Sequence, residues 1–292
     1  MNDARDDEAP APDGAPAPDG TPAPDGTPAP DEAPAPDGTP RTFRPAHAGR
    51  VLRVVVEYDG TDFSGWQRQP GMRTVQGVLE DGLRALLGEE IFVRGAGRTD
   101  AGVHADGQVA SLGVASRIPP HGLLRGLNSI LPDDVALVDV AEAPPTFDAR
   151  FSARGKVYRY TVWNHMVRSP LHARRSWHVR RTLDMAAIRE AAAALVGEHD
   201  FRAFRAADCE RRTTRRIVRR LDVERQGALL TFDVEATAFL KNMVRILVGT
   251  LVDVGRGTLG PDAITRMFET GDRAAGGITA PPQGLTLLRV LY

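Results

Sequence analysis

The segment Val51-Leu-Arg-Val-Val-Val-Glu-Tyr58 sets the expectation for the fold, because alternating, β-branched side chains are typical of a β-strand. After a loop rich in Gly and Asp, Thr74 is placed to cap a helix whose apolar residues recur at helical spacing as far as Leu87. The next expected elements are strands at 91–94 and 108–114, a helix at 119–130 and a strand at 135–140. The order of this half is therefore β-α-β-β-α-β.

The second half of the chain repeats that order with additions. The expected elements are strands at 156–163, 176–179, 217–223, 229–235 and 285–291, and helices at 184–196, 239–254 and 261–269. Two such units predict an α+β fold of two tandem ferredoxin-like subdomains with a central cleft. We expect the N-terminal subdomain to span residues 47–150 and the C-terminal subdomain residues 151–292.

Residues 1–46 are expected to form a disordered acidic tail. Five tandem copies of a hexapeptide, [AT]-P-A-P-D-[GE], run through residues 9–38, and such a composition cannot bury enough apolar surface to fold. Residues 1–40 carry ten Asp or Glu and one Arg. The rest of the chain has 36 Lys or Arg and 28 Asp or Glu, a formal charge of +8. This basic body favours a polyanionic partner, although arginine abundance alone is weak support for RNA.

Several classes of protein are disfavoured by composition. A single cysteine, Cys209, excludes an internal disulfide framework and a cysteine-based metal site. No apolar run reaches the roughly 18 residues that span a bilayer, so we expect no membrane association and a soluble, cytoplasmic protein. The histidines His165, His172 and His178 do not have the spacing of common metal ligands.

The candidate site is the segment Arg94-Gly-Ala-Gly-Arg-Thr-Asp-Ala-Gly-Val-His104, which lies between two expected strands. Its glycines allow a sharp turn and close approach to a ligand. A dinucleotide-binding loop is disfavoured, because a strand rather than a helix follows the glycines. Asp100 remains as a carboxylate beside Arg98 and near His104, and the adjacent guanidinium is expected to lower its pKa. The alternative is an Asp–Arg turn that only holds the loop.

Two further groups allow a nucleic-acid interpretation and a structural one. Tyr158 and Tyr160 lie on one face of an expected strand, where they can stack on bases or simply pack in the core. A dense group of arginines predicts a phosphate-contacting surface, or else a solvated strand edge. Its members are Arg211, Arg212, Arg215, Arg216, Arg219 and Arg220.

The chain resembles the TruA family of tRNA pseudouridine synthases across nearly all of its body. The motifs that carry the resemblance occur in the family's order. They are Gly97-Arg-Thr-Asp-Ala-Gly-Val-His-Ala105, Tyr58-Asp-Gly-Thr-Asp-Phe-Ser-Gly-Trp-Gln67, Thr74-Val-Gln-Gly77, Lys156-Val-Tyr-Arg-Tyr160, His199-Asp-Phe201, Phe239-Leu-Lys-Asn-Met-Val-Arg245 and Ala280-Pro-Pro-Gln-Gly-Leu285.

The resemblance implies a cofactor-free isomerase that acts on uridines at positions 38 to 40 of the tRNA anticodon stem-loop, as a homodimer. It implies that Asp100 is the nucleophile, and that Arg245 pairs with it. Tyr158 matches a residue that stacks on the target base and helps to remove the C5 proton. Arg98 is expected to hold the extruded nucleotide. Leu285 is expected to line the pocket, and His104 is a further candidate for substrate binding.

Two alternatives remain open at this point. A pseudouridine synthase with a different RNA target would carry the same loop. A non-catalytic RNA-binding protein could keep the same fold, but it would have no chemical need for Asp100, Tyr158 and Arg245 together.

Overall fold

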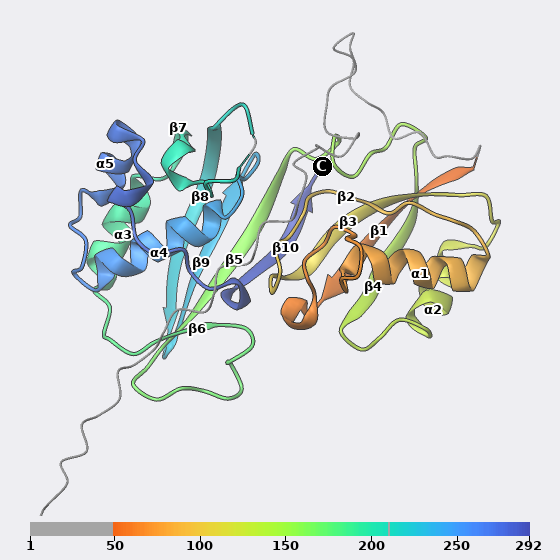
Figure 1. The fold of residues 1–292 in the computed structure, drawn as a ribbon, viewed down its shortest axis with the longest axis horizontal. Coiled ribbons are helices and arrows are strands. Elements are labelled where there is room, and N and C mark those ends of the chain that lie inside the picture. Colours follow the sequence, from red (N-terminus) through yellow and green to blue (C-terminus); the bar gives the residue numbers. More distant parts are fainter. Residues whose placement is uncertain (1–48, 210) are drawn as a thin grey trace, which may run out of the picture. The chain divides into compact units, whose positions relative to one another are not determined.

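The computed structural model describes residues 49–209 and 211–292. The predicted disordered tail at residues 1–46 lies outside them. The described residues contain one ten-stranded sheet with helices packed against it, which gives a mixed α+β architecture (Figure 1). No helix in this part of the chain is long and apolar enough to cross a membrane.

The first half has the expected order of elements. It comprises β1 (Arg50–Tyr58), α1 (Val75–Leu87), β2 (Arg94–Gly95), β3 (His104–Val114), α2 (Pro120–Asn128) and β4 (Val135–Ala143). Thr74 caps α1 as predicted, since its hydroxyl accepts a hydrogen bond from the backbone N–H of Gly77. The strand expected at 91–94 is wrong in extent, because only Arg94 and Gly95 pair with β3.

The second half adds elements to the same order. It comprises β5 (Gly155–Asn164), β6 (Trp177–Val179), α3 (Met185–Ala193), β7 (Gly197–Asp200), β8 (Arg215–Gln226), β9 (Leu229–Ala236), α4 (Met243–Gly255), α5 (Ala263–Thr270) and β10 (Leu285–Leu291). The expected hairpin between β8 and β9 is confirmed, with Gly227 at φ +61° in its turn. The short strand β7 was not expected.

The sheet runs without interruption through both halves, in the order β4-β1-β3-β10-β5-β9-β8-β7. The last strand of the chain, β10, lies between β3 and β5. It pairs in parallel with the start of β3, where Thr286 is opposite His104, and antiparallel with β5, where Leu285 is opposite Tyr160. The start of β3 therefore lies at the centre of the sheet, at the junction of the two halves.

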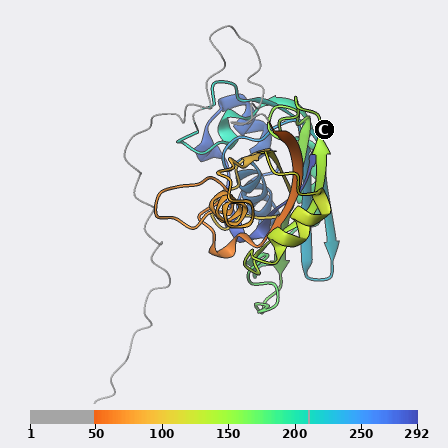
Figure 2. The same ribbon diagram turned by 90° about the vertical axis from the view of Figure 1, so that its right-hand side faces the viewer.

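The helices α1 and α4 lie on the same face of the sheet (Figures 1 and 2). Each presents buried apolar side chains toward the strands, and α4 is buried along almost its whole length. The aromatic side chains of Phe201, Phe204 and Phe232 are fully buried and belong to one continuous core. This core fixes the position of both helices relative to the central strands.

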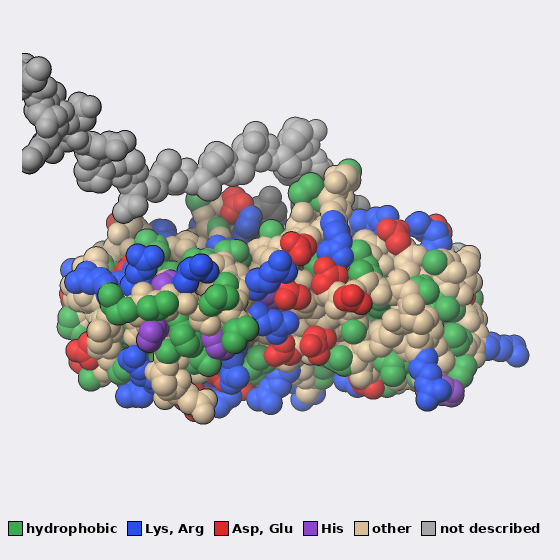
Figure 3. Space-filling model, turned by 90° about the horizontal axis from the view of Figure 1, so that it is seen from below, with side chains coloured by type: hydrophobic (Ala, Val, Ile, Leu, Met, Phe, Trp, Pro, Cys, Tyr) green, Lys and Arg blue, Asp and Glu red, His purple; other side chains and the backbone are tan. Residues whose placement is uncertain are grey.

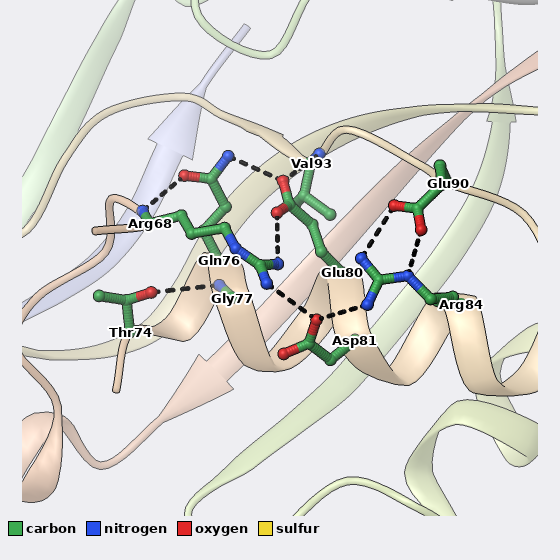
Figure 4. Close-up of polar contacts among 9 residues, drawn as sticks. All are labelled: Arg68, Thr74, Gln76, Gly77, Glu80, Asp81, Arg84, Glu90 and Val93. Carbon is green, nitrogen blue, oxygen red and sulfur yellow. Dashed lines mark hydrogen bonds and ion pairs between the residues drawn. The ribbon is translucent and has the colours of Figure 1, made fainter. Parts of the chain in front are cut away.

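Polar contacts on α1 fasten two neighbouring loops to the helix (Figure 4). The Gln76 side chain accepts a hydrogen bond from the backbone N–H of Arg68 and donates one to Glu80. The Glu80 carboxylate also accepts from the Val93 N–H and pairs with the Arg68 guanidinium at 3.0 Å. The segments on either side of the candidate loop are thereby attached to one rigid helix.

Candidate active site

The loop that carries Asp100 connects β2 with β3 at the centre of the sheet. Its backbone is held by the neighbouring segment, because the Trp66 N–H donates to the Thr99 carbonyl at 3.0 Å and the Gly102 N–H to the Phe63 carbonyl at 3.3 Å. The Gln108 side chain donates to the Gly97 carbonyl at 2.8 Å. The loop is thus tied to its surroundings at several points.

Two glycines make this close packing possible. Gly102 has φ +76°, a conformation that side-chain-bearing residues rarely adopt. Gly65 has φ +89°, and a Cβ there would lie 2.7 Å from the Thr99 carbonyl oxygen. Gly65 therefore allows backbone-to-backbone contact with the loop, and Gly102 supplies a turn conformation that other residues rarely adopt.

Asp100 and Arg245 come together from distant parts of the chain. The Arg245 Nη1 lies 3.7 Å from the Asp100 Oδ2, and the side chains are 16% and 35% exposed. Arg245, in α4, is oriented by two hydrogen bonds, from its Nε to the Ala280 carbonyl and from its Nη1 to the Asn242 side chain. The guanidinium is held in place by these contacts and faces a carboxylate that remains partly exposed to solvent.

Burial raises the pKa of Asp100 above its usual value, and the positive charges of Arg245 and Lys241 act in the opposite direction. Asp208, which pairs with Lys241, adds a negative charge that raises the pKa further. The expectation that Arg98 lowers this pKa is wrong in both direction and partner. Desolvation outweighs the nearby cations, and the exposed Arg98 donates a hydrogen bond to Gln67 at 3.2 Å.

Tyr158 lies in β5 with its side chain only 7% exposed. Its ring packs edge-on against Phe239, with 5.0 Å between the ring centroids. Burial raises the pKa of its phenol strongly, and the nearby Tyr58 and Asp100 add to the effect. The phenol is therefore neutral at physiological pH. Tyr160 is fully buried and donates a hydrogen bond to the Pro281 carbonyl, so it has a structural place.

His104 occupies the core, with no exposed side-chain surface. Its Nδ1 accepts from the Gly60 N–H at 3.0 Å and lies 3.2 Å from the Asp59 carboxylate, while Nε2 faces the carbonyls of Arg174 at 2.9 Å and Gln283 at 3.2 Å. Burial lowers its pKa and keeps the ring neutral. This geometry does not support the expected contact between His104 and substrate, because three backbone segments already use both ring nitrogens.

The segment around Arg174, whose carbonyl faces the His104 ring, also has charged side chains. Arg174 and Arg175 lie 3.8 Å from Asp62 and Asp59, respectively. Figure 3 shows one face of the molecule, on which acidic side chains lie beside Lys or Arg side chains. Asp59 also accepts a hydrogen bond from the Thr61 N–H, as a residue that forms a turn does.

Leu285 begins β10 and is 6% exposed. It lies opposite Tyr160 in the sheet and belongs to the main core. Sequence reasoning did not single out Lys241 and Asp208, which stand next to the Asp100–Arg245 pair. A signal was present, because Lys156 and Lys241 are the only lysines of the chain and both fall within the quoted motifs.

The chain was compared with known proteins. The family model described as tRNA pseudouridine synthase matches residues 54–152 and 191–292. The tRNA pseudouridine synthase A of Geotalea uraniireducens is 48% identical over 243 residues, which cover 83% of this chain and 100% of that protein. The protein of the same name from Myxococcus xanthus is 49% identical over 242 residues, 82% of this chain and 91% of that one. The chain therefore belongs to the tRNA pseudouridine synthase family, the isomerases that convert uridine to pseudouridine in transfer RNA.

Proposed function

We propose that this isomerase modifies uridines at positions 38, 39 and 40 of the tRNA anticodon stem-loop, with Asp100 as the nucleophile. The observation that carries the proposal is the Asp100–Arg245 pair, in which a partly exposed carboxylate lies 3.7 Å from an oriented guanidinium. Such a pair keeps a reactive carboxylate ionised in a partly desolvated site. The resemblance of the motifs supplies the positions in the tRNA.

The isomerisation exchanges one bond to the ribose for another. The bond between C1′ of the sugar and N1 of the base breaks, the base turns, and C1′ forms a bond with C5. C5 then loses a proton and N1 holds one, so the atoms balance without a cofactor. Asp100 can take part by attacking either the sugar carbon or the base. In both cases its carboxylate must be ionised and within reach of an extruded nucleotide.

The surrounding residues suit the steps that this reaction needs. Arg98 is exposed on the same loop as Asp100, so its guanidinium can support a nucleotide that has left its stack. Tyr158 is 7% exposed and lies near Asp100, which places it close to where the base would bind. Because its phenol is neutral, Tyr158 favours stacking over proton abstraction as its first role. Leu285 fits the floor of the pocket, and His104 fits a positioning role.

The proposal extends to the organisation of the molecule. The strand orders β4-β1-β3 with β2, and β10-β5-β9-β8, support two tandem ferredoxin-like units, with the division near residue 150. A homodimer and a cytoplasmic location follow from the family resemblance and from tRNA as substrate. Light scattering of the purified protein tests the dimer, and a mass of one chain would contradict it.

The test of the reaction is pseudouridine mapping on an unmodified tRNA transcript with uridines at positions 38 to 40. We expect conversion at these positions by the wild type and none by Asp100→Asn, which should still bind the transcript. Asp62→Asn is the matched control, because Asp62 is an exposed carboxylate whose Arg174 contact lies at 3.8 Å. Conversion by Asp100→Asn, or conversion at other positions only, would contradict the proposal.

A further inference from the structure

Besides Arg245, a second cationic side chain, that of Lys156, lies against the candidate loop. Its Nζ lies 3.2 Å from the point that a Cβ on Gly97 would occupy, so the amine rests against the backbone three residues before Asp100. Neither a hydrogen bond nor an ion pair joins this amine to any other residue in the described part of the chain. An unpaired amine in a largely desolvated position is costly unless an anion joins it.

Two arginines share this side of the sheet. Lys156 pairs in register with Ala236, and Ala236 pairs with Val218, so Lys156 and Val218 are on one face. Arg216 is two residues from Val218 and therefore points to that face as well. The positive charge of Arg211, in the preceding loop, acts on both Lys156 and Arg216.

Arg211 and Arg216 differ from the other arginines of the segment 211–220 in the partners that they contact. Arg215, Arg219 and Arg220 pair with Glu198, Glu235 and Asp222, so they match the expected strand edge. Arg211 and Arg216, in contrast, have no carboxylate partner among the residues that the structure describes. The Nε of Arg216 is buried and has no hydrogen-bond partner there. A bound anion would pair with these three neighbouring cations and would accept a hydrogen bond from the unsatisfied Nε of Arg216.

We propose that Lys156, Arg211 and Arg216 form an anion site that binds a backbone phosphate of the tRNA beside the target uridine. This inference rests on the proposed function of the Asp100 loop, which the site adjoins. A phosphate oxygen would accept from the Lys156 amine and from both guanidinium groups. The contact would position the tRNA backbone without reading the base sequence.

The pKa of Lys156 supports the same conclusion. Burial, with the charges of Arg150 and Arg211 acting in the same direction, lowers it to about 8. Gly97, the neighbour on the loop, presents only backbone. Free enzyme thus loses the Lys156 charge as pH rises through about 8, whereas the arginines keep theirs. We expect tRNA affinity of the wild type to fall as pH rises above 8.

The salt dependence of tRNA binding tests the site with Lys156→Met and Arg211→Gln. Loss of the whole contact with this phosphate should lower the slope of log Kd against log salt concentration by about 0.7 to 0.9, and removal of one of its three cations should lower it by part of that amount. Arg212→Gln is the matched control, since Arg212 is an adjacent exposed arginine that does not act on Lys156. We expect both test variants to lower the slope, the control to change it less, and Lys156→Met to lack the loss of affinity above pH 8.

Unchanged slopes in both test variants would overturn the proposal, and so would equal changes in Arg211→Gln and Arg212→Gln. Because Arg211 lies in a loop, its variant remains informative if Lys156→Met does not fold. The result is separate from the reaction itself. A wild type that binds tRNA without converting it would refute the proposed function, while the slopes would still report on this site.

Discussion

Replacement of Arg245 by glutamine removes the positive charge nearest to Asp100. At 3.7 Å and an effective dielectric constant of about 20, the attraction between the two charges is roughly 4 kcal/mol. Because the Asp100 side chain is 35% exposed, we halve this value for solvent screening, to about 2 kcal/mol. One pKa unit corresponds to about 1.4 kcal/mol. The pKa of Asp100, already raised by burial, should therefore rise further in this variant.

The assay is kcat/KM for pseudouridine formation as a function of pH. With Asp100 as the proposed nucleophile, kcat/KM should fall at low pH as its carboxylate becomes protonated, and this acid limb should move upward by about 1 to 2 pH units in Arg245→Gln. Arg245→Lys is the control, because it keeps a positive charge but loses the hydrogen bonds to Ala280 and Asn242. Its acid limb should stay closer to that of the wild type even where its rate is lower.

An acid limb at the same pH in the wild type and in Arg245→Gln would refute the reasoning. Unfolding free energy gives a check that does not depend on catalysis. The pKa of Asp100 is higher in the folded chain than in the unfolded one, so protonation favours the folded state. The loss of stability in Arg245→Gln should therefore be largest above the raised pKa and should shrink as pH falls below it.

Two further variants test how the loop is held in place. His104→Ala leaves the Gly60 N–H without its acceptor and two carbonyls without their donor, so urea unfolding should show a loss of about 3 kcal/mol; a loss below about 1 kcal/mol would contradict a structural role. Gly65→Ala should lower kcat. It should also lower the free energy of unfolding by about 1 to 3 kcal/mol or more, because its Cβ would meet the Thr99 carbonyl at 2.7 Å. Gly71→Ala is its control, with a similar φ of +71° but no atom within 4 Å, and equal losses in both variants would mean that the clash is unimportant.

The order of the main elements could be predicted because it depends on local patterns. Alternating residues in β1, β5 and β9 and helical spacing in α1 encode their own conformations, so neighbours along the chain suffice. The start of α4 could not be predicted from spacing, since residues 239–242 continue the apolar pattern. Asn242 has φ +60° and ends that continuity, and its side chain accepts from Arg245. A residue in the left-handed conformation, with a local contact three residues further along the chain, therefore sets this boundary.

Some features of the candidate site could likewise be predicted from the sequence, and others could not. The motif around Asp100 singled out the candidate loop, and the family resemblance predicted the pairing with Arg245, which lies 3.7 Å away. The direction of the pKa shift could not be read from the motif, because Arg98 is adjacent in sequence but bonds to Gln67. Likewise, His104 stands in the motif like a substrate ligand, and only its burial shows that it joins backbone segments.

The sequence by itself determined the α+β class, the glycine-rich loop and the residue types that the chemistry needs. The tertiary structure alone decided that β10 lies between β3 and β5, which brings the loop of Asp100 within reach of α4. It also decided that Lys156 has no carboxylate partner among the described residues, whereas arginines of the segment 211–220, such as Arg215, do have one. The physical reason is that strand pairing, desolvation and charge pairing act through space. They depend on which distant segments the core packs together, and local sequence patterns do not encode that.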